Sequence, residues 1–115
     1  MRDLLFPESK KSMAYKLIIS RKADENIDNI INYLVVNISN RQAAEAVIED
    51  IDDAYRKLEE RAESYAYCSD SYLASKGYRQ LPLSKHNYII LYRVEGDDVF
   101  ISGVFHTREN YIQKL

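Results

Sequence analysis

The chain has few of the features that cross-link a small protein or anchor it in a membrane. Among its 115 residues there is one cysteine, Cys68, so no disulfide can form within the chain. A lone thiol is typical of a reducing compartment, and we expect Cys68 to pack in the core rather than act as a nucleophile. No apolar run approaches the roughly 18 residues of a membrane span, and the first residues lack the apolar segment of a signal peptide. These absences predict a cytoplasmic protein with no membrane partner.

Tryptophan is absent, and glycine and proline occur only three times and twice. The aromatic residues are ten tyrosines and three phenylalanines, so many hydroxyl groups need partners at a core edge or a contact surface. Hydrophobic residues make up 46% of the chain, which suits one modest core. We expect one domain over residues 13–115. Residues 1–12, interrupted by Pro7, are expected to form a flexible extension.

Positive charge is also scarce, and it is unevenly distributed. The sequence pI is about 5.7. Residues 21–63 contain six Lys/Arg against eleven Asp/Glu, a net charge of −5, whereas residues 76–115 contain six against four, a net charge of +2. Any surface that binds anions is therefore expected in the second half of the chain.

The first half predicts a strand followed by a helical hairpin. Residues 15–20, "YKLIIS", are short, apolar and β-rich, which predicts a strand. Ser20 then stands where the N-cap of a helix is expected, and apolar residues follow it at helical spacing. Ser39 and Gln42 form a capping-box pattern before a second, longer apolar stripe. The short break between the stripes predicts two antiparallel helices.

The second half predicts three strands. Residues 64–77 show no clear period and are expected to form a loop. Strands are then predicted over 78–83, 87–94 and 99–105, with a tight turn at 95–98 and one final turn of helix at the end. In the strand at 87–94 the residues that point to either face of the sheet are mainly apolar, so this strand should be central and covered on both faces.

These elements together predict an α+β fold with two layers. The N-terminal strand and the three-stranded antiparallel meander form a four-stranded sheet, and the helical hairpin buries its apolar stripe against one face. The opposite face is expected to stay partly open beside the C-terminal tail and to serve as a binding surface.

The run "GYRQLPLSKHNYIILYRVEGDDVFISGVFHTREN" at 77–110 resembles the RelE/ParE superfamily, the toxins of bacterial type II toxin–antitoxin modules, also described as plasmid stabilisation proteins. The resemblance extends over residues 14–111. It implies a cognate antitoxin whose flexible segment wraps the toxin. It also implies one of two targets, since one branch of the superfamily cleaves mRNA on the ribosome and the other poisons DNA gyrase. A catalytically inactive relative that only binds the antitoxin is a third reading.

If the chain is a ribosome-dependent endoribonuclease, the resemblance implies metal-independent catalysis without a cofactor. RNA cleavage of this kind needs a base for the 2′-OH, cations for the charged phosphorane and an acid for the leaving oxygen. The candidate catalytic residues are His106, Arg108, Arg79 and Tyr111, and Glu109 is a weaker candidate base. Histidine titrates near neutral pH, arginine can hold two phosphate oxygens, and tyrosine can stack on a base.

Two features depart from the RNA-cleaving branch. Many of its members carry a Tyr-Arg pair early in the third strand of the sheet, where this chain has Tyr88-Ile89. Those members are also commonly basic, whereas this chain is acidic overall. Phosphate neutralisation supplies much of the affinity for RNA, so both targets remain open from the sequence. The oligomeric state and the antitoxin family are not predicted.

Overall fold

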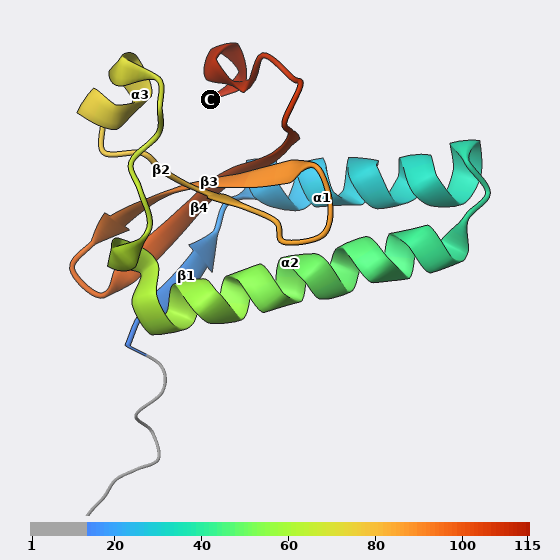
Figure 1. Ribbon diagram of the computed structural model, residues 1–115, viewed down its shortest axis with the longest axis horizontal. Coiled ribbons are helices and arrows are strands. Elements are labelled where there is room, and N and C mark those ends of the chain that lie inside the picture. The colour runs from blue at the N-terminus through green and yellow to red at the C-terminus, as the bar shows by residue number, and fades with distance from the viewer. Residues whose placement is uncertain (1–13) are drawn as a thin grey trace, which may run out of the picture.

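The chain is described by a computed structural model over residues 14–115, so the extension predicted for residues 1–12 lies outside the described part. The sheet consists of β1 (Lys16–Ile19), β2 (Arg79–Pro82), β3 (Tyr88–Glu95) and β4 (Asp98–His106). Its strand order is β1-β4-β3-β2 (Figure 1). β1 pairs in parallel with β4, and the other pairs are antiparallel. The predicted α+β architecture is confirmed.

The helical hairpin consists of α1 (Arg21–Asn32), which continues as a π-helical turn (Tyr33–Asn37), and α2 (Arg41–Arg61). The predicted cap of α1 is confirmed, because the Ser20 hydroxyl accepts a hydrogen bond of 3.0 Å from the backbone N–H of Ala23. The predicted cap of α2 is wrong by one residue. Ser39 adopts a left-handed φ of 57°, so Asn40 becomes the N-cap and accepts from the N–H of Ala43 at 2.9 Å.

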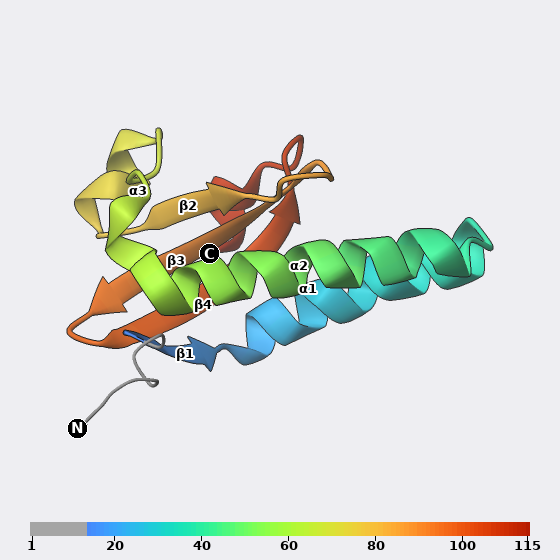
Figure 2. The same ribbon diagram turned by 60° about the horizontal axis from the view of Figure 1, so that its bottom comes forward.

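The hairpin covers one face of the sheet, and its far end extends beyond the strands (Figure 2). The main core lies between these two layers, because the apolar stripe of the helices has no other surface to bury against. Its buried residues are Ala23, Val47, Ile51, Ala54, Leu58, Ala62, Leu81, Leu83, Ile90, Tyr92, Val99, Ile101 and Val104.

The opposite face of the sheet is more covered than the sequence predicts. The segment expected to be a loop contains α3 (Ser71–Ser75), and the chain ends in a 3-10 turn (Tyr111–Lys114). Both lie on the side of the sheet away from α2 (Figure 1). Their side chains join this face in a second apolar cluster of Cys68, Leu73, Ile89, Leu91 and Phe105, with Tyr78 and Tyr111 packed against it. The expectation of an open face is therefore wrong where α3 and the C-terminal turn cover the sheet. The predicted burial of the centre of β3 on both faces is confirmed.

A β-bulge in β4 sets which residues face the helices. Leu91 lies opposite Gly103, but the next residue of β3, Tyr92, lies opposite Ile101, so Ser102 is an extra residue. As a result Ile101 and Val104, three positions apart, both belong to the helix-side core. Within residues 14–115, no helix combines the length and apolar character that a membrane span requires.

Candidate functional site

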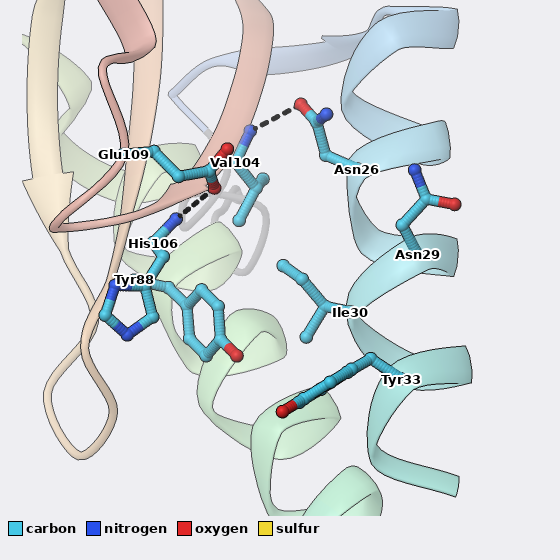
Figure 3. Close-up of a pocket in the computed structure, with 8 residues that line it drawn as sticks. All are labelled: Asn26, Asn29, Ile30, Tyr33, Tyr88, Val104, His106 and Glu109. Atoms are coloured by element: carbon cyan, nitrogen blue, oxygen red, sulfur yellow. Dashed lines mark hydrogen bonds between the residues drawn. The ribbon is translucent and has the colours of Figure 1, made fainter. Parts of the chain in front are cut away.

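An open pocket lies where the end of the sheet meets α1. It has a volume of about 390 Å³ and is lined by both polar and apolar side chains from β3, β4, α1 and the turn after β4. Figure 3 shows these residues, which are Asn26, Asn29, Ile30, Tyr33, Tyr88, Val104, His106 and Glu109. We call it the α1 pocket.

His106 is the last residue of β4 and reaches the α1 pocket beside Tyr88, its neighbour on β3. The two rings meet edge to face, with centroids 5.4 Å apart and planes at 81°. The backbone N–H of Arg108 donates to His106 Nδ1 at 3.1 Å. Because Nδ1 accepts this bond, the neutral ring carries its proton on Nε2.

Glu109 folds back on the end of β4. Its Oε1 accepts from the backbone N–H of His106 at 2.9 Å, and its Oε2 accepts from Lys114 Nζ at 2.7 Å. Partial burial opposes ionisation of the carboxylate, but these two bonds outweigh it and lower the pKa of Glu109. A carboxylate with a lowered pKa is a weaker general base. The pKa of Tyr88 is raised by burial and by the nearby charge of Glu109, so its hydroxyl stays protonated.

The opposite wall of the pocket comes from α1 and the π-helical turn that continues it, and its residues were not predicted from the sequence. The side chain of Asn26 bonds to the backbone of Val104, and the rings of Tyr33 and Tyr88 direct their hydroxyls into the same space (Figure 3). Tyr33 is 53% exposed. No local pattern marks these residues, because Asn26 and Val104 are 78 positions apart and meet only through the tertiary fold.

Arg79 lies at the start of β2 and is committed to the structure around it. One Nη donates to the carbonyls of Tyr65 at 2.6 Å and Glu63 at 3.2 Å, and the guanidinium lies 4.0 Å from the centre of the Tyr67 ring. These contacts fix the loop after α2 to the sheet. To bind a phosphate as predicted, the Arg79 guanidinium would have to give up some of these contacts.

The structure does not bring the four candidate catalytic residues together. Arg79 lies opposite Tyr92 in register and His106 opposite Tyr88, four residues away along β3, which is about 13 Å at the rise of a strand. Tyr111 lies on the other face of the sheet from His106, in the second apolar cluster. The expectation that His106 borders an open sheet face is wrong, because the bulge turns it toward the helices.

Tyr111 and Arg108 have distinct surroundings. The ring of Tyr111 stacks on Phe105 with centroids 5.9 Å apart and planes at 20°. Arg108 is exposed in the turn after β4, and its side chain makes no ion pair with any residue of 14–115. Its backbone, not its guanidinium, contacts His106. The catalytic roles of all four residues stay predictions.

No cluster of three or more His, Cys, Asp or Glu side chains suited to a metal ion occurs among residues 14–115. Polar groups that could hold a ligand in the α1 pocket are the two tyrosine hydroxyls, the His106 ring and the Asn29 amide. This set favours hydrogen bonding to a protein or an uncharged group rather than to a phosphate.

Comparison with known proteins agrees with this architecture. A family model for the "ParE toxin of type II toxin-antitoxin system, parDE" matches residues 17–111. A solved structure of the "Chromosomal ParDE TA system from P. aeruginosa" is similar at a TM-score of 0.67 and 25% sequence identity, covering 83% of this chain and 98% of that chain. No curated protein matches the chain. Because the family model spans most of its length, this chain belongs to the ParE toxin family of type II toxin–antitoxin systems.

Proposed function

We propose that this toxin blocks growth by binding DNA gyrase through the α1 pocket and the adjoining end of the helical hairpin, without cleaving RNA itself, and that a cognate antitoxin in the cytoplasm neutralises it. The observation that carries the proposal is the separation of the candidate catalytic side chains. His106 lies on the helix side of the sheet, and Tyr111 is stacked on Phe105 on the other side.

Metal-free RNA cleavage requires an acid, a base and cations around one phosphate. Here the guanidinium of Arg79 is held by two backbone carbonyls, and Glu109 has a lowered pKa. Only His106 and Arg108 remain near one another. A histidine at the end of a strand and an arginine in the exposed turn after it supply few of the contacts that hold a reacting phosphate in place.

Charge also supports a protein target. No lysine or arginine is among the described residues that line the α1 pocket, whose charged lining residue is Glu109. The pocket therefore lacks the cations from which affinity for nucleic acid largely comes. A protein partner does not require them.

The surface around the α1 pocket has the composition of a protein-binding site. Tyr33, Val36 and Ile38, at the end of the hairpin, are 53%, 64% and 49% exposed. Tyrosine beside aliphatic side chains is typical of the centre of an interface, where an aromatic ring fills a pocket and its hydroxyl keeps a hydrogen bond.

The test compares two assays on the same purified protein. We expect inhibition of gyrase supercoiling and no cleavage of mRNA by primer extension with purified ribosomes. Tyr33→Ala should weaken gyrase inhibition by about tenfold or more, as for an interface hot spot. Tyr72→Ala, an equally exposed tyrosine on α3, is the control and should leave inhibition unchanged.

Cleavage of mRNA that disappears in His106→Ala would overturn the proposal in favour of the endoribonuclease. Absence of growth arrest on induction of the full chain would instead point to an inactive relative that only binds antitoxin. Growth arrest with intact mRNA and normal supercoiling would exclude gyrase as the target.

A further inference from the structure

A second pocket lies on the other side of the sheet, between α3 and the C-terminal turn. In Figure 1 these two segments stand on the same side, away from α2. The pocket has a volume of about 280 Å³, and none of its residues lines the α1 pocket. We call it the α3 pocket, and it is lined by Tyr72, Leu73, Lys76, Tyr78, Arg93, Ile112 and Leu115.

Two cations in the α3 pocket are placed over tyrosine rings. Lys76 Nζ lies 5.5 Å from the centre of the Tyr72 ring, and the guanidinium of Arg93 lies 5.6 Å from that of Tyr78. A cation over an aromatic face is held in position without losing its charge. The pocket therefore presents two positioned positive groups.

These cations retain unused binding capacity. Arg93 Nε is buried and has no hydrogen-bond partner among the described residues. Its Nη1 lies 3.5 Å from a carboxylate oxygen of Glu95, in an exposed pair of the kind that contributes little. Lys76 makes no ion pair with any residue of 14–115. The Nε group is out of reach of a ligand, but the Arg93 side chain is 40% exposed, so its Nη groups can exchange this weak pair for an incoming carboxylate.

The remaining walls are apolar. Leu73 is 1% exposed and forms the floor, while Ile112 and Leu115 are 39% and 40% exposed. Covering two half-exposed aliphatic side chains removes apolar surface from water. An occupant that fits therefore carries a negative group next to an aliphatic one.

We propose that the α3 pocket takes an acidic and aliphatic peptide segment of the antitoxin, with a carboxylate between Lys76 and Arg93 and an aliphatic side chain against Ile112 and Leu115. The proposal rests on the proposed function only in naming the antitoxin as the source of the segment. Charge complementarity supports it, because residues 76–115 carry a net charge of +2 while the helices over 21–63 carry −5. An acidic segment is thus repelled by the hairpin and attracted to this side.

Nucleic acid fits the α3 pocket less well. A bound strand needs a row of cations along its phosphates, whereas this pocket offers two, enclosed by aliphatic side chains. Two donors of this kind match one carboxylate.

The test uses defined probes on the full chain. An acetylated and amidated hexapeptide of alternating Glu and Leu is titrated by calorimetry and by amide NMR, beside the same peptide with Gln in place of Glu and beside a uridine hexanucleotide. We expect the Glu peptide to bind and to shift amide signals of residues 72–78 and 112–115. The Lys76→Gln/Arg93→Gln variant should bind it roughly fivefold more weakly, as for two exposed ion pairs.

The control is Lys22→Gln/Arg41→Gln, which removes the same charge from exposed positions on the hairpin and should leave the affinity unchanged. The amide spectra also report whether each variant is folded. Equal binding of the Gln peptide, unchanged affinity of the pocket variant, or tighter binding of the hexanucleotide would each overturn the proposal. The gyrase and mRNA assays need no peptide, so their failure would remove the proposed target and leave the pocket result standing.

Discussion

The side chain of Asn26 in α1 accepts a hydrogen bond of 3.1 Å from the backbone N–H of Val104 in β4. β1 ends at Ile19, opposite Ile101, so β4 continues beyond it without a neighbouring strand on that side. An unpaired strand edge is a site for unwanted association. Asn26 satisfies one donor of this edge, and Glu109 satisfies the next at His106.

Asn26→Ala is expected to lower the free energy of unfolding by about 1 kcal/mol, because the N–H of Val104 loses its partner. Urea denaturation followed by circular dichroism measures this change. Asn29→Ala is the matched control, since Asn29 is exposed on the same helix and makes no side-chain bond within residues 14–115. An equal loss in both variants would show that helix propensity, not the bond to β4, is responsible.

Asp50 is a buried carboxylate, 3% exposed, that holds the loop between β2 and β3. It accepts from the backbone N–H of Lys85 at 2.9 Å and contacts His86 Nδ1 at 2.7 Å. Burial opposes its ionisation, but these bonds outweigh the burial and lower its pKa. Asp50→Asn should therefore destabilise the protein at neutral pH by about 1–3 kcal/mol.

The pKa of Asp50 is lower in the folded than in the unfolded state, so its contribution to stability is present above the unfolded value of about 4 and is lost as the pH falls through the folded value. The difference in unfolding free energy between the native chain and Asp50→Asn should shrink on acidification below about pH 4. Asp52→Asn, at an exposed position, should show no such change. A pH-independent difference would contradict the assignment.

Tyr92 is fully buried, and its hydroxyl donates to the carbonyl of Ala62 at 2.7 Å, which joins the centre of the sheet to the end of α2. Tyr92→Phe keeps the ring and removes the bond. We expect a loss of about 1–2 kcal/mol in unfolding free energy, because the carbonyl is left without that partner. Tyr72→Phe, at a 60% exposed site, is the control and should be neutral.

Cys68 is buried in the second apolar cluster, and burial, with the nearby charge of Asp70, raises its pKa to about 11. Little thiolate exists at pH 8, so reaction with Ellman's reagent should be slow in the folded protein. Denaturation in urea should release one rapidly reacting thiol. Complete reaction of the native protein within seconds would place Cys68 at the surface.

The regular elements could be predicted from the sequence because each depends on neighbouring residues. Ser20 caps α1 as predicted, because its hydroxyl accepts a hydrogen bond from a backbone N–H only three residues along the chain. α3 was missed because five residues are too few for a helical period. The sequence did mark its two ends, with Asp70 before it and Gly77 after it. In the structure Asp70 is the N-cap, and Gly77 adopts a left-handed φ of 88°.

The candidate site was harder to predict, because it depends on which face each strand residue occupies. His106 and Tyr111 are close in the sequence and both suit RNA cleavage, yet the fold places them on opposite faces. The bulge at Ser102 has one marker in the sequence, the glycine that follows it inside the strand at position 103, but alternation alone does not show how the bulge turns the rest of β4.

That extra residue decides which molecules the end of the strand can meet. If Ser102 were paired as an ordinary strand residue, His106 would turn toward the α3 side and Phe105 toward the helices. Deleting Ser102 would instead leave both side chains where they are, because residues 103–106 already alternate as if it were absent. A substitution that abolishes the bulge but keeps the residue is thus a route by which closely similar sequences acquire different targets.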